Sequence, residues 1–267
     1  MELGISSYTF GWAVGVTGRE ESRPLDEHGL LDKCREHGVS VLQIGDNLPL
    51  HAFDASRLDR LAARAARDGV QLEVGARGLT KNRLVDYVMI ARRVGAALVR
   101  FVIDDTDYHP PAEAVAALLR ESAPLLDGLV LGLENHDRFP AAMLRTMIER
   151  IGSDHIGICL DTANSLGAGE GIAAVAEILA PLTVNLHIKD FHIERVPSLM
   201  GFTVTGRPAG SGFLDVPALL NRLAPFGRCR TAILELWTPP EPLSQETIVK
   251  EAAWATQSIK YLKPFFI

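Results

Sequence analysis

The chain has 267 residues, of which 47% are hydrophobic and 22% charged, a composition typical of a soluble globular protein with a sizeable core. Its net charge of -6 at pH 7 argues against nucleic acid or an anionic membrane as the main partner. The three cysteines form no CxxC pair, no apolar run approaches the roughly 20 residues of a membrane helix, and the N-terminal residues lack a signal-peptide pattern. These features predict a cytoplasmic protein with free thiols.

Short β-rich segments alternate with amphipathic helical patterns along the whole chain. The predicted strands cover residues 2–9, 39–45, 70–76, 97–103, 129–135, 155–161, 183–190 and 230–236. The segments between them have apolar residues at i, i+3, i+4 and i+7, and an eighth helix is predicted over 244–263. Glycines just before strands are predicted to end helices in the left-handed conformation: Gly38, Gly69, Gly95, Gly128 and Gly152.

Strict alternation of strands and helices predicts right-handed crossovers and a parallel sheet. Eight such units in a chain of this length match a (β/α)8 barrel. A doubly wound open sheet is the alternative, but no GxGxxG follows the first strand, and "GAGEG" at 167–171 follows a late one. Because no linker or low-complexity tract interrupts the pattern, we predict a single α/β domain over residues 1–267, a TIM barrel.

Metal-binding side chains stand at or near the ends of four consecutive predicted strands: Glu134, Asp161, His187 and Glu235. In such a barrel, the carboxyl ends of the strands converge on the active site. Three carboxylates and one imidazole suit Mn2+, Mg2+ or Co2+, with Zn2+ as an alternative. Each residue alone is better explained as a helix cap or an ordinary hydrogen-bonding group, but four at successive strand ends predict a metal site.

Five segments of the second half carry a resemblance to a known family: "LGLENHD", "IGICLDTAN", "NLHIKD", "GRPAGSGFLD" and "AILELW". In order and spacing they resemble the xylose-isomerase-like TIM barrel superfamily of sugar phosphate isomerases and epimerases. The superfamily also includes ketose 3-epimerases, inosose dehydratases and an endonuclease IV branch. That branch is set aside, because its three-zinc site needs more histidines and the acidic balance does not suit DNA.

The resemblance implies functions for individual residues. It implies that Glu134, Asp161, His187 and Glu235 bind the metal ion, and that Glu134 and Glu235 also act as acid and base on opposite sides of a sugar. The sequence departs from the ketose epimerases at Asn164, where they usually have a histidine, and Asn164 is predicted to bind substrate. Residues are also inserted before Arg207, the best match for their arginine, which is predicted to bind substrate.

Several further residues have both a functional and a structural interpretation. Lys189 follows His187 by two residues on the same face of a strand, and we predict that it binds a substrate anion, supplies a proton, or pairs with Asp190 or another carboxylate. Arg100 lies in an apolar strand and is predicted to pair with Glu73 inside the barrel, with anion binding as the alternative.

Two segments outside the strands complete the candidate site. His136 follows a strand end and is a candidate for binding substrate, although a solvated position is the simpler interpretation. The connection over residues 191–215 is unusually long and contains the apolar Leu199, Met200 and Phe202. Two alternatives stay open for it, packing over the pocket or against a second subunit of a homo-oligomer.

The leading hypothesis is a divalent-metal-dependent isomerase or epimerase that acts on a small keto sugar or sugar acid through an enediolate. The alternative is a metal-dependent lyase, either a decarboxylase or a dehydratase, because the same enediolate can expel water or form after loss of CO2. Asn164, Lys189 and Arg207 keep this alternative open, since they suit an acid substrate. A non-catalytic sugar-binding barrel is the third hypothesis.

Overall fold

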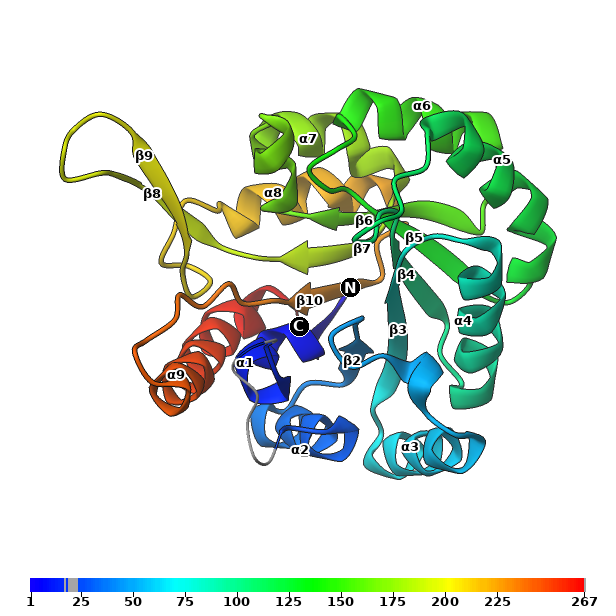
Figure 1. Ribbon diagram of the computed structural model, residues 1–267, viewed down its shortest axis with the longest axis horizontal. Coiled ribbons are helices and arrows are strands. Elements are labelled where there is room, and N and C mark those ends of the chain that lie inside the picture. Colours follow the sequence, from blue (N-terminus) through cyan, green and yellow to red (C-terminus); the bar gives the residue numbers. More distant parts are fainter. Residues whose placement is uncertain (17, 19–23, 267) are drawn as a thin grey trace.

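The computed structural model describes residues 1–16, 18 and 24–266 (Figure 1). Eight parallel strands close into a barrel in the order β1-β10-β7-β6-β5-β4-β3-β2. These strands are β1 (Glu2–Ser6), β2 (Val41–Ile44), β3 (Gln71–Arg77), β4 (Leu98–Val102), β5 (Val130–Glu134), β6 (Ile156–Asp161), β7 (Thr183–Ile188) and β10 (Thr231–Leu234). All eight predicted strands form, and the prediction of a TIM barrel is confirmed.

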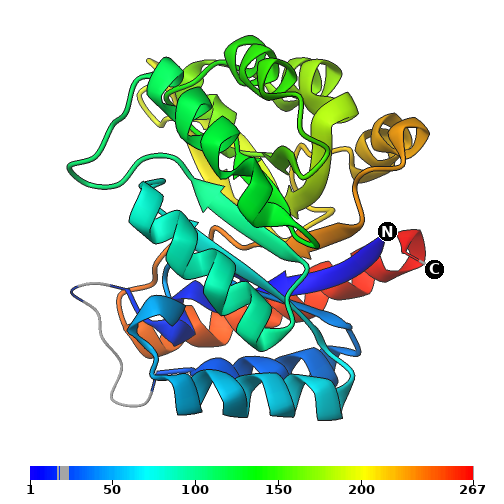
Figure 2. The same cartoon turned by 90° about the vertical axis from the view of Figure 1, so that its right-hand side faces the viewer.

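Helices surround the barrel and cover the outer faces of its strands (Figures 1 and 2). They are α1 (Gly11–Val14), α2 (Glu27–His37), α3 (Ala55–Asp68), α4 (Lys81–Val94), α5 (Ala112–Ser122), α6 (Ala141–Ile151), α7 (Ile172–Leu179), α8 (Val216–Leu223) and α9 (Ser244–Leu262). The last helix corresponds to the one predicted over 244–263. The five glycines predicted to end helices all have φ between +56° and +75°, a region that glycine adopts without strain.

Alternation along each strand sends every second side chain into the barrel. On β6, Ile158 and Leu160 belong to the apolar core, whereas Cys159 and Asp161 contact polar groups inside the barrel. The strands are therefore buried on both faces, as their apolar sequences predict. The inward-facing side chains near the strand ends are the ones available for chemistry.

The predicted pairing of Arg100 with Glu73 is wrong. Strand register places Arg100 beside Gly75 and Gly132, two residues nearer the carboxyl end of the barrel than Glu73. The guanidinium group therefore pairs with carboxylates at the mouth, whereas Glu73 accepts hydrogen bonds from neutral side chains deeper in the barrel. The guanidinium group lies over Gly75, since a Cβ added at position 75 would be in ordinary contact with Arg100 Nε at 3.6 Å.

The connection after β7 contains a regular element that the sequence interpretation missed. Residues Phe191–Arg195 (β8) and Phe202–Gly206 (β9) form an antiparallel hairpin that extends away from the barrel (Figure 1). At its tip, Leu199 is 68% and Met200 90% exposed, so these side chains do not pack over the pocket in this structure. Contact of the hairpin with a second subunit stays a prediction.

Asp190 fixes the base of this hairpin to the end of β7. Its Oδ2 accepts hydrogen bonds from the backbone N–H groups of Gly210 and Gly212, and its Oδ1 accepts from those of Phe191 and Leu214. Both ends of the inserted segment therefore converge on one buried carboxylate. A side chain at position 212 would collide with it, because an added Cβ would lie 2.2 Å from Asp190 Oδ1.

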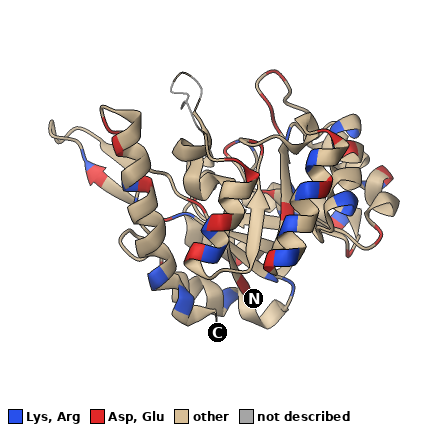
Figure 3. Cartoon of the chain, turned by 90° about the horizontal axis from the view of Figure 1, so that it is seen from below, with Lys and Arg blue, Asp and Glu red and all other residues tan. Residues whose placement is uncertain are grey.

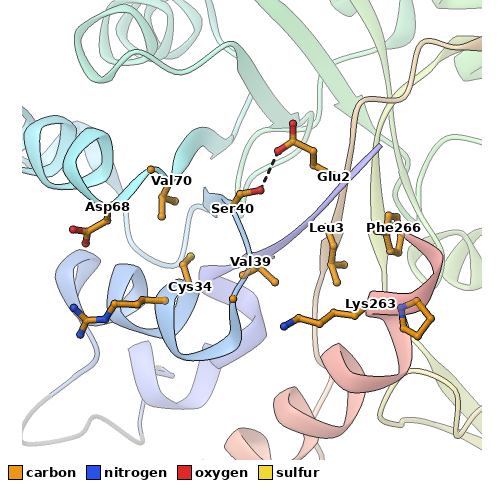
Figure 4. A pocket seen from close by; sticks show the side chains of 13 residues that line it. Glu2, Leu3, Cys34, Val39, Ser40, Asp68, Val70, Lys263 and Phe266 are labelled. Atoms are coloured by element: carbon orange, nitrogen blue, oxygen red, sulfur yellow. Dashed lines mark hydrogen bonds between the residues drawn. The ribbon is translucent and has the colours of Figure 1, made fainter.

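A groove of about 840 Å3 lies at the opposite, amino end of the barrel (Figure 4). Leu3, Val39 and Phe266 are among the residues that line it, and Ser40 Oγ donates a hydrogen bond of 3.0 Å to Glu2 at its edge. No candidate site residue lines this groove. The active sites of TIM barrels lie at the carboxyl ends of the strands, at the other end of the barrel from this groove.

The outer helices carry acidic and basic side chains in close alternation (Figure 3). Some of them form ion pairs, such as Arg64 with Asp32 and Asp68 on α2 and α3. Among the helices of the described chain, none combines the length and apolar character that crossing a membrane requires.

A buried carboxyl group of α9 makes stability depend on pH. Glu251 accepts hydrogen bonds from the backbone N–H groups of Trp12 and Ala13 in α1. Burial raises its pKa from 4.5 to about 7, although these N–H groups oppose the shift. Between these two pH values the folded chain keeps a proton that the unfolded chain has lost, so the free energy of unfolding falls as pH rises and levels off above about 7.

Between pH 4.5 and pH 7.5 we therefore expect the free energy of unfolding of wild-type protein to fall by up to about 3 kcal/mol relative to that of Glu251→Gln. One pKa unit corresponds to about 1.4 kcal/mol. Urea unfolding of both proteins across this pH range measures the difference in unfolding free energy. The contributions of titrating groups that both proteins share cancel in this difference. Parallel pH profiles for the two proteins would contradict the assignment.

Candidate metal centre and active-site mouth

The four predicted metal ligands come together at the carboxyl end of the barrel. Glu134 ends β5, Asp161 ends β6, and His187 lies near the end of β7. Glu235 directly follows β10. The distances from His187 Nδ1 are 3.7 Å to Glu134 Oε2, 3.8 Å to Asp161 Oδ2 and 3.6 Å to Glu235 Oε1. All four residues are at most 3% exposed, so the cluster is buried.

Atoms that face the middle of this cluster lack hydrogen-bond partners. Glu134 Oε2, Asp161 Oδ2 and His187 Nδ1 have no hydrogen-bond partner among the described residues. They form ion pairs with one another, and the two carboxylates also pair with Arg100 and Lys189. Unpaired buried polar atoms are costly unless another group satisfies them. Carboxylate oxygens with one imidazole nitrogen fit a divalent cation, so the residues present suit the metal ion that the sequence predicts.

A cysteine lies beside this cluster. Within the described chain, Glu134, Cys159 and His187 offer ligand atoms within 4.8 Å of one another, as do Asp161, His187 and Glu235. Burial, and next Glu134, raise the pKa of the Cys159 thiol well above its usual value. The neutral thiol donates to Asn185 Oδ1 at 3.1 Å, which favours the carboxylates over sulfur as ligands.

Lys189 lies directly over the carboxylate cluster. Its Nζ is 2.9 Å from Asp161 Oδ2 and 3.0 Å from Glu235 Oε2, and its side chain is 15% exposed. Of the predicted alternatives, the ion pair is therefore with these two carboxylates, and the carboxylate of Asp190 is used by backbone N–H groups instead. An ammonium group here partly neutralises a site that would otherwise hold several like charges.

Both oxygen atoms of Glu134 are held by other side chains. Its Oε2 lies 2.7 Å from Arg100 Nε, and its Oε1 accepts a hydrogen bond of 2.7 Å from Asn164 Nδ2. Arg100 in turn donates to Asp46 Oδ1 at 2.8 Å. The position at which the ketose epimerases usually have histidine thus carries an amide that orients this carboxylate.

Opposite charges keep the centre ionised. Burial favours the neutral carboxyl forms, but His187 and Lys189 outweigh it and hold the pKa of Asp161 and of Glu235 below their usual values. Burial also lowers the pKa of His187 and of Lys189, yet the nearby carboxylates raise both pKa values above normal. Ionised carboxylates are the form in which these residues bind a metal ion.

A cavity of about 370 Å3 opens above the cluster. The residues that line it include Tyr8, Asn164, Lys189, Glu235 and Trp237. Leu166 and Leu236 add apolar surface beside these polar groups. The cavity therefore has a charged floor and a partly apolar wall, as expected for a site that binds a small polar molecule.

The other two predicted substrate-binding residues lie in different places. His136 lines the cavity, where its Nδ1 is 2.7 Å from Asp137 Oδ1. Arg207 pairs instead with Glu194 of the hairpin and is not among the cavity-lining residues. Its predicted contact with substrate would require a different arrangement of the hairpin base.

The sequence interpretation missed Tyr8 and Asp46. The hydroxyl of Tyr8 donates to Asp46 Oδ2 at 2.9 Å, and Arg77 and Arg100 also pair with Asp46. Asp46 lies just beyond the predicted strand over 39–45, so the strand-end signal that identified Asp161 was present here too. Tyr8 has no comparable signal, because one tyrosine in a β-rich segment is ordinary.

Comparison with known proteins agrees with this geometry. The profile of the family described as "Xylose isomerase-like TIM barrel" matches residues 31–265. The chain is 34% identical over 267 residues to 3-oxo-isoapionate decarboxylase of Pectobacterium atrosepticum, covering 98% of this chain and 95% of that protein.

Two solved structures have the same fold. One is D-psicose 3-epimerase in the presence of D-fructose, with a TM-score of 0.72 at 14% identity, covering 100% of this chain and 99% of that chain. The other is a protein from Mycobacterium smegmatis in complex with magnesium, with a TM-score of 0.71 at 14% identity, covering 97% of each chain. With the family profile and the geometry of the strand ends, these matches show that the chain belongs to the xylose isomerase-like TIM barrel family.

Proposed function

We propose that this protein is a divalent-metal-dependent lyase that removes CO2 from a small 3-oxo sugar acid. The observation that carries the proposal is the ammonium group of Lys189, which lies between Asp161 and Glu235 at the floor of the mouth cavity. The similarity to 3-oxo-isoapionate decarboxylase over nearly the whole chain supports the same reaction class. The lyase is therefore preferred to the isomerase that was the leading hypothesis from sequence.

The reaction follows from the chemistry of a 3-oxo acid with a hydroxyl group on C2. Loss of CO2 breaks the bond between C1 and C2, and its electron pair forms an enediolate over C2 and C3. A proton delivered to C2 then gives the neutral product. Because isomerases pass through the same kind of enediolate, one site can serve either outcome, depending on which groups handle protons.

Glu134, Asp161, His187 and Glu235 would hold the divalent cation, which supplies Lewis-acid stabilisation of negative charge on the substrate's oxygen atoms. The residues around this centre assist in separate ways. Lys189 is positioned to donate the proton to C2, because its ammonium group lines the cavity. Leu166, Leu236 and Trp237 offer apolar surface, which favours the change from a carboxylate to neutral CO2.

The contacts of Glu134 with Arg100 and Asn164 favour decarboxylation over epimerisation. Epimerisation requires two groups that exchange protons on opposite faces of the sugar. Here one oxygen of Glu134 pairs with Arg100 and the other accepts from Asn164, so this carboxylate suits metal binding and is poorly available as a base. Decarboxylation requires only one proton donor, which Lys189 supplies.

An isomerase or epimerase is the second candidate. The observation that favours it is that Glu134 and Glu235 both lie within 3.7 Å of His187 Nδ1, so two carboxylates flank one centre. The two candidates share the metal ion, the cavity and the enediolate. They differ only in whether carbon is lost.

The two reactions are separated by incubating the Mn2+-loaded protein in D2O with 3-oxo sugar acids and with neutral ketoses. Decarboxylation predicts one CO2 released and one deuterium gained at C2 for each turnover of the acid. Deuterium incorporation with an unchanged carbon count would overturn the proposal in favour of isomerisation, and loss of water alone would indicate a dehydratase. Binding of these compounds without turnover of any would favour the non-catalytic barrel.

A further inference from the structure

The barrel interior just beneath the candidate metal centre is polar, although barrels of this fold usually fill such layers with branched apolar side chains. Five side chains form this sub-site layer, each at most 3% exposed: Gln43, Glu73, Cys159, Asn185 and Thr231. Strand register pairs Gln43 with Glu73, and Asn185 with Thr231 and Cys159. Hydrogen bonds from Gln43 Nε2 to Glu73 and Asn185 join the two groups across the barrel. Such a layer is costly unless its hydrogen bonds are complete, which suggests a specific role.

Glu73 fixes the orientation of the Gln43 amide. Glu73 Oε2 accepts hydrogen bonds from Gln43 Nε2 at 2.9 Å and Asn185 Nδ2 at 3.2 Å, and its Oε1 accepts from Thr231 Oγ1 at 2.6 Å. Gln43 Nε2 also donates to Asn185 Oδ1 at 3.1 Å. Because both N–H groups of Gln43 are used on this side, its carbonyl oxygen points the other way.

That carbonyl oxygen meets His187 from across the barrel. Gln43 Oε1 lies 2.7 Å from His187 Nε2. A carbonyl oxygen only accepts hydrogen bonds, so Nε2 carries a proton and a neutral imidazole keeps its lone pair on Nδ1. Nδ1 is the atom that faces Glu134, Asp161 and Glu235.

We propose that Gln43 is a positioning residue of the metal centre, whose carbonyl oxygen holds His187 with Nε2 protonated and Nδ1 free to bind a divalent cation, while Glu73 holds Gln43. Metal-binding histidines generally donate their second N–H to an oxygen acceptor that fixes the tautomer and the ring orientation. In this chain a side-chain amide, anchored by a buried carboxyl group, takes that place. The inference rests on the proposed metal centre and does not depend on which reaction the centre catalyses.

Titration of metal-stripped protein with Mn2+ tests the proposal. We expect Gln43→Leu to weaken Mn2+ binding by about 10- to 100-fold, the usual cost of losing such a partner. Gln71→Leu is the matched control, because Gln71 is exposed at the start of the neighbouring β3. The Mn2+ affinity of this variant should stay within about twofold of wild type. Unchanged Mn2+ affinity in Gln43→Leu would overturn the proposal.

A second measurement needs no substitution at Gln43. In the Mg2+-loaded wild-type protein, the imidazole 15N signals of His187, assigned by their absence in His187→Gln, should report a protonated Nε2 and an unprotonated Nδ1. The opposite tautomer would overturn the proposal. So would a Gln43→Leu protein that unfolds at a lower temperature but keeps the wild-type affinity and tautomer, since its role would then be structural.

Failure of this inference is distinguishable from failure of the proposed function. If wild-type protein binds neither Mn2+ nor Mg2+, there is no metal centre, and both proposals are wrong. If wild-type protein and Gln43→Leu bind Mn2+ equally tightly, only the positioning role of Gln43 is wrong.

Discussion

Replacing Asp161 by asparagine is expected to weaken Mn2+ binding by about 1,000-fold or more, well beyond the 10- to 100-fold cost of losing an outer partner. Asp161 Oδ1 accepts hydrogen bonds from the backbone N–H groups of Ala163 and Asn164, and an asparagine would keep its oxygen there. Its NH2 group would then face the metal position, where it cannot act as a ligand. Calorimetric titration of metal-stripped protein measures the loss.

The control for this prediction is a residue just before the opposite, amino end of the same strand. Asp154 is exposed just before β6, so Asp154→Asn makes the same chemical change at the amino end of the barrel. Its Mn2+ affinity should match that of wild type. Added Mn2+ should raise the unfolding temperature of wild type and Asp154→Asn but not of Asp161→Asn, because a ligand stabilises only a fold that binds it. If Asp161→Asn binds Mn2+ as tightly as wild type does, Asp161 is not a metal ligand.

Replacing Lys189 by methionine is expected to lower kcat by about 100- to 10,000-fold, the usual range for loss of a positioned proton donor. The same change should strengthen Mn2+ binding several-fold, because the ammonium group competes with a cation for Asp161 and Glu235. Methionine keeps the length of the side chain, so packing in the cavity changes little. Steady-state kinetics at saturating Mn2+, with calorimetry of Mn2+ binding, measure the two effects.

These opposite effects distinguish a chemical role for Lys189 from a structural one. A structural role predicts weaker metal binding together with slower turnover. Lys189→Arg provides a further control, since it keeps the charge but donates a proton poorly. Full activity in Lys189→Met would exclude this residue as the proton donor and would favour another group of the cavity, such as Tyr8.

Much of the fold and the ligand cluster could be predicted because the signals are local. Each barrel strand is a short apolar run, and Glu134 and Asp161 mark where two of them end. A barrel then brings neighbouring strand ends together without any knowledge of tertiary contacts. The convergence of these carboxylates with His187 follows from topology alone, which is why the predicted ligands lie within a few ångströms of one another.

The partners of side chains inside the barrel could not be predicted, because they depend on strand register and on contacts across the barrel. Arg100 pairs with Glu134 and Asp46 since it lies two residues nearer the mouth than Glu73. Gln43 meets His187 from a strand that is not its neighbour in the barrel. No spacing in the sequence encodes either contact.

The hairpin was missed for a different reason. Its strands pair only with each other and lie outside the barrel, so their pattern does not match that of a buried parallel strand. The cross-strand pair Ile193 and Val204 is exposed, and polar residues surround both side chains in the sequence, as in a loop. A two-stranded element with little apolar burial has a weak sequence signal.

We propose that Glu134, Asp161, His187 and Glu235 hold a divalent cation that the decarboxylation requires. The most direct test follows 13CO2 release from a carboxyl-labelled 3-oxo sugar acid while Mn2+ is added stepwise to metal-stripped protein. We expect no release without metal and a rate that rises with bound Mn2+ and saturates at one ion per chain. Release at the full rate from metal-stripped protein, or none from protein carrying one Mn2+ per chain with any such acid, would contradict it.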